Sequence, residues 1–125
     1  MLALAALLMG VPRALGLDID ADALRAAAEN ARLNALNRRL QLVRGGPDAV
    51  TGTWPLVVAN LLAAPLVELA PVLVRRVGHH GRLVVSGIQS SVEGDVDRAY
   101  RRLGMQQVRA QSRAGWSALV LQASW

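Results

Sequence analysis

Short, fully apolar segments alternate along the chain with longer segments in which apolar residues recur every three or four positions. Fully apolar runs are typical of buried strands in a parallel sheet, and the longer spacing is typical of helices with one buried face. The expected strands cover residues 14–17, 40–43, 56–59, 83–85, 107–109 and 118–122. The expected helices cover about residues 2–9, 21–33, 65–77 and 91–103. This alternation predicts an α/β fold, with helices on both faces of a mainly parallel sheet and a final antiparallel hairpin.

Each expected helix has an apolar stripe and residues that suit its ends. Asp20 is a candidate N-cap for helix 21–33, and Pro65 suits the first turn of helix 65–77. Residues 78–81, with the sequence GHHG, are expected to form a turn. The expected inward residues of the four helices are Leu2, Ala5, Ala6 and Met9; Leu24, Ala27, Ala28 and Ala31; Leu66, Leu69, Ala70, Leu73 and Val77; and Val92, Val96, Ala99, Tyr100 and Leu103.

Length and composition predict one globular domain over residues 1–125, since 53% of the residues are hydrophobic and 18% are charged. The absence of cysteine excludes disulfides and cysteine nucleophiles, and it is compatible with a reducing cytoplasm. The opening run MLALAALLMG lacks the preceding positive charge of a signal peptide and is shorter than the roughly 20 residues that span a bilayer. We therefore expect a cytoplasmic protein with no membrane partner.

A net charge of +5 raises the question of a nucleic-acid partner. The basic residues are mostly arginines spread along the expected helices, without a run of five or six like charges or interleaved aromatic residues. We therefore interpret the positive charge as solvated helix surface and expect no nucleic-acid partner. A non-catalytic basic module that binds RNA stays an alternative, which a salt-dependent shift with RNA would favour.

Polar residues and glycines follow four of the expected strands. Asp18 follows the first strand, residues 45–48 the second, Asn60 the third, and Ser86 with Gly87 the fourth. The carboxyl ends of parallel strands meet at one edge of a sheet, where ligands bind in such folds. A few polar groups on an apolar scaffold are typical of a small-molecule site.

Two of these residues have specific candidate roles. The carboxylate of Asp18 can accept both hydroxyls of a ribose; the alternative is a turn or capping aspartate, although Asp20 already suits the cap. The Asn60 amide can orient an amine nucleophile, or else it satisfies the backbone of its own loop. His79 and His80 are adjacent and have no third ligand nearby, so we expect turn histidines and no metal site.

Four segments follow one another in a distinctive order: ALGLDIDADALRAAAENARLN, LVVANLLAAPLVELAP, GRLVVSGI and GWSALVLQ. They resemble, in turn, the second strand and its helix, the fourth strand and its helix, the fifth strand and the last strand of one family. That family is the methyltransferases that modify ribosomal protein L-eleven, the stalk-base protein of the large subunit. The similarity covers essentially the whole chain, and VVAN with LVVSGI is much more specific than DID alone.

The resemblance implies a Rossmann-like class I S-adenosylmethionine-dependent methyltransferase fold with sheet order 3-2-1-4-5-7-6. It implies methyl transfer to lysine side chains and an N-terminal amine of a ribosomal protein, with no metal. By position, Asp18 would bind the cofactor ribose, Ile19 would pack near its adenine, and Asn60 would hold the target amine beside the methyl group. Gly46, in the glycine turn after the second expected strand, is a further cofactor-binding candidate.

The chain departs from the family pattern in three places. Trp54-Pro55 stand where the family usually has an acid, and residues 79–81 (HHG) replace its glycine turn before the fifth strand. The family's first strand, its G-x-G-x-G loop and its substrate-recognition domain would precede Leu2. We therefore expect residues 1–125 to form a partial domain that, alone, binds S-adenosylmethionine poorly and is inactive. A different class I methyltransferase, acting on another amine or a small molecule, is a second alternative.

Overall fold

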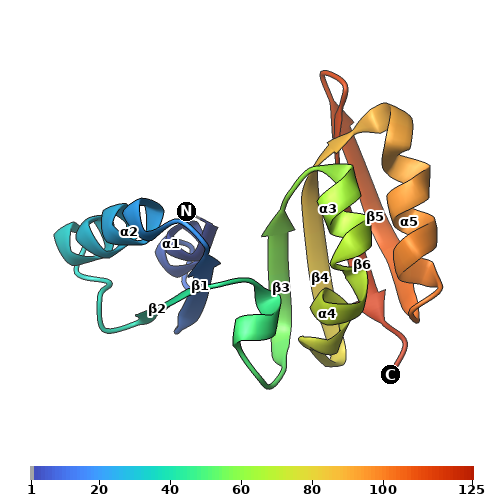
Figure 1. Cartoon of the computed structure of the whole chain (residues 1–125). Helices are drawn as coiled ribbons and strands as arrows, with labels where there is room; N and C mark the ends of the chain where they lie inside the picture. The colour runs from blue at the N-terminus through green and yellow to red at the C-terminus, as the bar shows by residue number, and fades with distance from the viewer. Residues whose placement is uncertain (1) are drawn as a thin grey trace. The chain divides into compact units, whose positions relative to one another are not determined.

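The computed structural model describes residues 2–125. The chain forms two compact units, Met1–Val50 and Thr51–Trp125, and each unit has its own sheet (Figure 1). The expectation that residues 1–125 form a single partial domain stays a prediction. Over residues 2–125, no helix is long and apolar enough to cross a membrane.

The first unit contains a two-stranded parallel sheet, in which Ala14 lies opposite Leu40 and Asp18 lies opposite Arg44. Both strands and the second helix are confirmed within one residue of their expected ends. The side chain of Asp20 accepts a hydrogen bond from the backbone N–H of Asp22 and caps that helix, as predicted. The elements are α1 (Leu2–Leu8), β1 (Ala14–Asp18), α2 (Ala21–Leu33), β2 (Leu40–Arg44) and the 3-10 helix η1 (Pro47–Ala49).

The expected inward face of the first helix is wrong. Leu4 and Leu7 are its buried residues, whereas Met9 is 86% exposed. Helix α1 ends at Leu8, so Met9 lies beyond its last turn, and burying two leucines removes more apolar area from water than burying Ala5 and Ala6 would. The core of this unit is Leu4, Leu7, Ala27, Ala31 and Leu36, with Ala14, Leu40 and Leu42 of the sheet packed against it.

The side chain of Arg39, just before β2, donates hydrogen bonds to the end of α1 and to the segment that follows it. Its Nε donates to the Pro12 carbonyl at 2.9 Å, and one terminal nitrogen donates to the carbonyls of Leu7, at 3.4 Å, and Val11. The Leu7 carbonyl also accepts the N–H of Gly10 at 3.1 Å, whereas the Val11 and Pro12 carbonyls lie beyond the helix. The guanidinium therefore donates to two carbonyls that follow the helix and shares a third with Gly10.

The second unit contains a four-stranded mixed sheet in the order β3-β4-β6-β5. Strands β3 and β4 are parallel, whereas β6 is antiparallel to both β4 and β5, which confirms the predicted closing hairpin. Helices α3, α4 and α5 lie on one face of this sheet (Figure 1). The elements are β3 (Trp54–Asn60), α3 (Ala63–Glu68), α4 (Ala70–Arg75), β4 (Val77–Gln89), the 3-10 helix η2 (Ser90–Val92), α5 (Glu93–Arg101), β5 (Met105–Arg113) and β6 (Trp116–Ala123).

The GHHG segment lies within strand β4 and does not form the expected separate turn. Trp54 pairs with Val77 and Leu56 pairs with Arg82, so β4 advances five residues while β3 advances two. The extra residues form an irregular bulge in which His80 has φ +57° and donates its backbone N–H to the Trp125 carbonyl at 2.7 Å. Pairing with β3 and the C-terminal residue thus overrides the local turn pattern.

The single helix expected over residues 65–77 is two helices, α3 and α4. Pro71 has no N–H to donate to the carbonyl one turn earlier, so a regular helix cannot run through this position. The helix expected over residues 91–103 is also shorter: it begins as η2, α5 ends at Arg101, and Leu103 is 36% exposed. The other expected inward residues of this segment include Val96 and Tyr100, which are fully buried.

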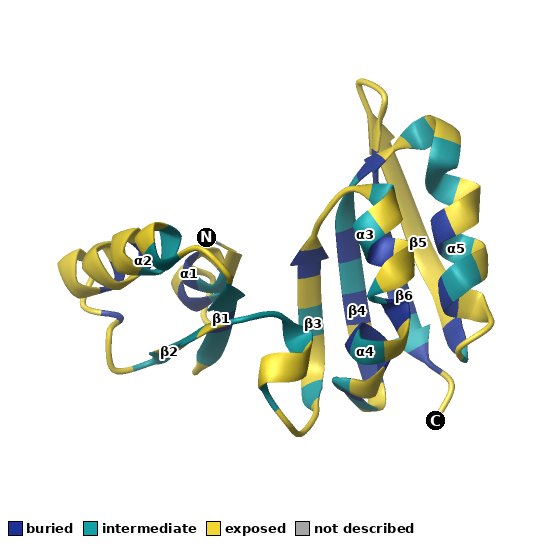
Figure 2. Ribbon diagram, viewed as in Figure 1, coloured by how far each residue is buried: buried dark blue, intermediate teal, exposed yellow. Residues whose placement is uncertain are grey.

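The core of the second unit lies between the sheet and helices α3 to α5, while β5 is exposed from Gln106 onward (Figure 2). Its fully buried side chains include Leu66, Leu83 and Leu119. The Tyr100 hydroxyl donates to the Leu66 carbonyl at 2.7 Å, near the end of α3. Burial raises the pKa of the Tyr100 hydroxyl above its usual value, because the charged form is poorly solvated there.

Candidate functional site

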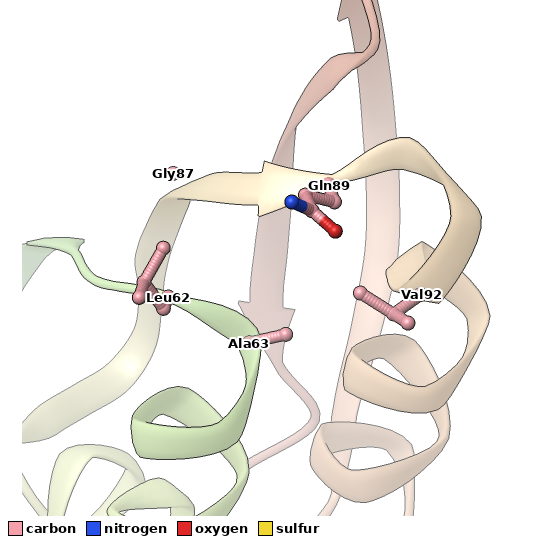
Figure 3. A pocket seen from close by; sticks show the side chains of 5 residues that line it. All are labelled: Leu62, Ala63, Gly87, Gln89 and Val92. Atoms are coloured by element: carbon pink, nitrogen blue, oxygen red, sulfur yellow. The ribbon is translucent and has the colours of Figure 1, made fainter.

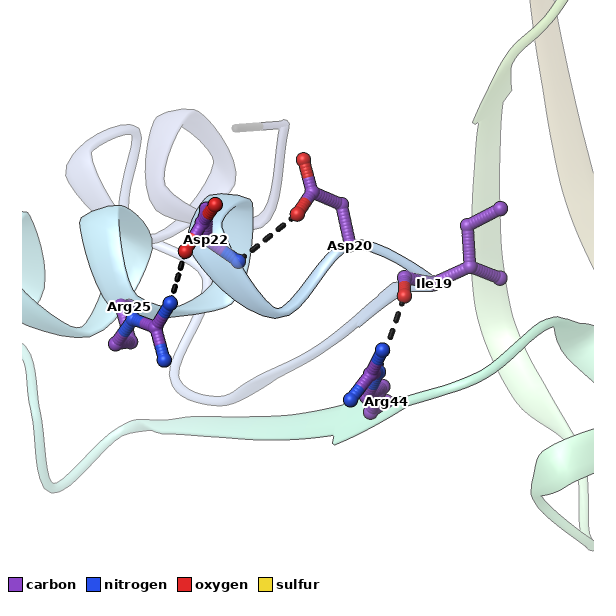
Figure 4. Close-up of polar contacts among 5 residues, drawn as sticks. All are labelled: Ile19, Asp20, Asp22, Arg25 and Arg44. Atoms are coloured by element: carbon purple, nitrogen blue, oxygen red, sulfur yellow. Dashed lines mark hydrogen bonds and ion pairs between the residues drawn. The ribbon is translucent and has the colours of Figure 1, made fainter.

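Asp18, the proposed ribose-binding acid, lies at the carboxyl end of β1. Its Oδ1 accepts the backbone N–H of Asp20 at 2.9 Å. Figure 4 shows the next bond, in which the Oδ1 of Asp20 accepts the N–H of Asp22 at 2.9 Å. Asp18 therefore takes the turn role with one oxygen, which was the alternative to ribose binding. No residue in the range 2–125 donates a hydrogen bond to its other oxygen, Oδ2, which stays open to a ligand.

Ile19, the residue expected near the adenine, is 75% exposed at the same edge of β1. Its carbonyl accepts a hydrogen bond from Arg44 Nε at 3.1 Å (Figure 4), and Arg44 lies opposite Asp18 in the parallel pair. The ends of β1 and β2 are thus fixed to each other through a side chain. The exposed isoleucine leaves an apolar surface beside the carboxylate. Arg44 was not predicted, although its place at the end of a strand could have indicated a role.

The glycine turn that contains Gly46 follows β2 and lies beside the end of β1. Gly45 donates its N–H to the Asp18 carbonyl at 2.9 Å, and a side chain is excluded there because φ is +152° and an added Cβ would lie 2.6 Å from Ala49 Cβ. Gly46 precedes η1, and its carbonyl accepts the N–H of Ala49 at 2.9 Å. The structure therefore brings Asp18, Ile19 and the Gly46 turn together at one edge of the first unit.

Asn60, the proposed amine-orienting residue, ends β3 in the second unit. It is paired with Ser86 of β4, and the next residue, Leu61, donates its N–H to the Ser86 carbonyl at 3.1 Å. Ser86 and Gly87 were expected to follow their strand, but they lie within it, because β4 continues to Gln89. The backbone of Asn60 is consequently part of a strand pair and not of a free loop, and its side chain is exposed.

A cavity of about 180 Å³ opens beside Gly87 at this end of the sheet (Figure 3). It is lined by Leu62, Ala63, Gly87, Gln89 and Val92. Its walls are mainly apolar, and the Gln89 amide is the polar side chain among them. Ala63 and Gln89 were not predicted from the sequence, and Val92 was predicted only as an inward helix residue, because the meeting of these residues depends on where β4 ends and η2 begins.

The rings of the two histidines of the GHHG segment contact each other in a tilted arrangement, with their centroids 3.9 Å apart and their planes at 48°. They lie at the bulge near Trp54, away from the Asn60 end of β3 in the same sheet. Within residues 2–125, no group of three or more His, Asp or Glu side chains is placed to hold a metal ion. The expectation of no metal site stays a prediction.

Solved structures establish the class of fold. The chain superposes on a ribosomal protein L11 methylase from Lactobacillus delbrueckii subsp. bulgaricus with a TM-score of 0.92 and 30% identity, covering 99% of this chain and 64% of that one. It also superposes on the magnesium protoporphyrin IX methyltransferase of Synechocystis PCC 6803, solved with bound SAH, with a TM-score of 0.79 and 14% identity, covering 98% and 68%. The fold is therefore that of a Rossmann-like class I methyltransferase.

The family follows from the sequence comparisons. The family model described as ribosomal protein L11 methyltransferase (PrmA) matches residues 1–124, so the chain belongs to that family. A ribosomal protein L11 methyltransferase of Stenotrophomonas maltophilia (strain K279a) is 43% identical over 99 residues, which are 79% of this chain and 32% of the relative. One from Geotalea uraniireducens (strain Rf4) is 40% identical over 121 residues, 94% and 38%. The chain thus spans about a third of the length of these curated relatives.

Proposed function

We propose that this chain serves methyl transfer from S-adenosylmethionine to amino groups of a ribosomal protein, namely lysine side chains and an N-terminal amine. The observation that carries this proposal is the family match over residues 1–124. Two features of the structure support it: an open carboxylate oxygen at the end of β1 and an amide at the end of β3. A cytoplasmic location and a ribosomal protein partner belong to the same proposal.

The edge of the first unit fits the nucleoside part of the cofactor. Oδ2 of Asp18 is free to accept a ribose hydroxyl, while its Oδ1 and the backbone N–H of Asp20 hold the carboxylate in place. The exposed side chain of Ile19 offers an apolar surface for a purine ring. The turn at Gly46 lies beside them without a bulky side chain, so it leaves room for a ligand at this edge.

The end of β3 fits an amine acceptor. The Oδ1 of Asn60 can accept a hydrogen bond from an uncharged amine and leave the nitrogen lone pair free for attack. The apolar cavity beside Gly87 suits the aliphatic stem of such an amine. S-adenosylmethionine, when bound, supplies an electrophilic methyl group, so the residues of this chain need only hold the amine in line and exclude water.

A direct test uses a longer protein that contains this sequence, isotope-labelled S-adenosylmethionine and three acceptors. We expect label in the stalk-base ribosomal protein, on lysine and on the N-terminal amine, and none in ribosomal RNA or free small amines. Label in a small amine alone would favour a different class I methyltransferase. Salt-dependent binding of RNA without any methyl transfer would favour the non-catalytic basic module.

A further inference from the structure

Gly87 lies at an irregular point of β4. Val85 pairs with Leu119 of β6 and Ile88 pairs with Ser117, so β4 advances three residues while β6 advances two. The one extra residue is a bulge, and Gly87 has φ +83° there, a backbone conformation that side chains disfavour. The bulge interrupts the pairing of β4 with β6 on the stretch that faces the end of β3.

The space next to Gly87 is filled by Asn60 and the peptide that follows it. A Cβ atom at position 87 would lie 2.6 Å from Asn60 Oδ1 and 2.8 Å from the Leu61 carbonyl oxygen. Both distances are shorter than any ordinary contact to carbon. The side-chain amide that we assign to the acceptor therefore rests directly against the Gly87 backbone.

The neighbouring backbone cannot readily withdraw from this contact. The Leu61 N–H donates to the Ser86 carbonyl at 3.1 Å, and Asn60 is paired with Ser86 in the parallel ladder. An added methyl group at position 87 would therefore displace the Asn60 side chain, which can move, and would also press on the Leu61 carbonyl, which is backbone. Gly87 also lines the cavity that would take the stem of the amine, so the displaced amide would move relative to that cavity.

We propose that Gly87 is a positioning residue for Asn60: its missing side chain leaves the space in which the Asn60 amide is held in one orientation beside the cavity. The consequence for methyl transfer rests on the proposed function, whereas the orientation of Asn60 is a property of the chain itself. Gly115 serves as a control that separates backbone strain from the contact with Asn60. It has the same φ of +83°, but no atom lies within 4 Å of a Cβ added there. Gly115→Ala therefore carries the same backbone strain without the contact.

The first experiment follows the side-chain amide signals of the 125-residue chain by NMR, with the Asn60 signal assigned through its loss in Asn60→Ala. We expect the Asn60 Nδ2 signal to shift in Gly87→Ala and to stay unchanged in Gly115→Ala. An Asn60 signal that does not respond to Gly87→Ala would overturn the proposal. The unmodified chain provides a measurement that needs no stable variant: we expect the Asn60 amide to be more ordered than that of Asn37, although both residues are exposed. Equal mobility of the two amides would also overturn it.

The second experiment measures methyl transfer in a longer, active protein that contains this sequence. We expect Gly87→Ala to lower kcat at least tenfold, with the KM for S-adenosylmethionine within twofold and Gly115→Ala near the parent rate. In an Asn60→Ala background, Gly87→Ala should cause a smaller loss than in the parent, and the loss that remains measures the contact with the Leu61 carbonyl. An equal loss in both backgrounds would show that Gly87 does not act through Asn60. If the parent protein transfers no methyl group, the proposed function fails, and the amide signals still decide the role of Gly87.

Discussion

The two compact units bury apolar residues to very different extents. Within residues 2–125, the core of the second unit has fifteen buried residues and a four-stranded sheet, whereas that of the first has five and a two-stranded sheet. Apolar burial is the dominant favourable contribution to folding, and units of about 50 residues are marginal on this basis alone. The first unit relies more on polar ties to its backbone, such as those of Arg39. It is also the unit that carries the proposed nucleoside-binding edge.

The proposed cofactor-binding residues and the proposed acceptor residue lie in different units, an arrangement that we call the division of labour. The proposed acceptor residue, Asn60, lies in the well-packed unit, where a strand pair and Gly87 fix it. The proposed cofactor residues Asp18, Ile19 and Gly46 lie in the unit with the smaller core. We expect ligand binding to stabilise the first unit more than the second, because a ligand stabilises what it contacts.

The largest loss of stability is expected when a buried side chain in the core of the second unit is truncated. Leu83 is fully buried in β4, so Leu83→Ala should lower the free energy of unfolding by about 2–5 kcal/mol. Leu56→Ala, at a residue that is 47% exposed on the neighbouring strand, should cost less than about 1 kcal/mol. Hydrogen exchange should show the loss of protection concentrated in residues 51–125. Equal loss in residues 2–50 would mean that the two units unfold together.

An intermediate loss of stability is expected when the hydrogen bonds from Arg39 to the backbone of the first unit are removed. Arg39→Met keeps an apolar stem but removes the donors to Leu7, Val11 and Pro12, which should cost about 1–3 kcal/mol. Arg38→Met, at the exposed neighbour, is the matched control and should be nearly neutral. The measurement is amide exchange in β1 and α2. If both variants behave alike, Arg39 does not hold this unit together.

A smaller effect is expected from the buried tyrosine of the second unit. Tyr100→Phe should cost about 0.5–2 kcal/mol, because the Leu66 carbonyl loses its buried hydroxyl donor. The folded pKa of Tyr100 is raised, so the neutral form is favoured in the folded state. Its contribution is therefore complete below the unfolded pKa of about 10 and is lost as pH rises further.

Urea unfolding between pH 8 and pH 11 tests both parts of that prediction. The parent chain should lose stability above about pH 10, and Tyr100→Phe should lose less over the same interval. Parallel pH curves for the two proteins would show that the Tyr100 hydroxyl does not titrate differently on folding.

Local patterns predicted the features that depend on neighbouring residues. The strand expected over residues 14–17, the Asp20 cap and the final hairpin each depend on a short stretch of sequence. The cap and the hairpin are confirmed, and the strand is confirmed with one more residue, Asp18. The GHHG segment was misjudged because its strand conformation depends on pairing with β3. The inward face of α1 was misjudged because the helix ends one residue before Met9.

In the candidate site, too, the sequence predicted what depends on neighbouring residues and missed what depends on distant pairing. Asp18, Gly46 and Asn60 could be named because each follows an expected strand, Ile19 could be named only from the family resemblance, and the roles of all four stay predictions. The contact between Gly87 and Asn60 could not be predicted, because it depends on a bulge against β6 and on the exact distance between two strands. Gln89 was missed for a similar reason, since β4 extends four residues beyond its expected end at Val85.

The most direct test of the division of labour crosses two variants with two measurements in a longer, active protein that contains this sequence. Asp18→Asn should weaken binding of S-adenosylhomocysteine by about 5–150-fold, equivalent to roughly 1–3 kcal/mol, because the charged acceptor for the ribose is lost. Its single-turnover rate with saturating S-adenosylmethionine should stay near that of the parent. Asn60→Ala should leave S-adenosylhomocysteine binding within about twofold and lower the methyl-transfer rate. The reverse pattern, or equal losses in both measurements for both variants, would contradict the assignment of cofactor binding to the first unit and acceptor orientation to the second.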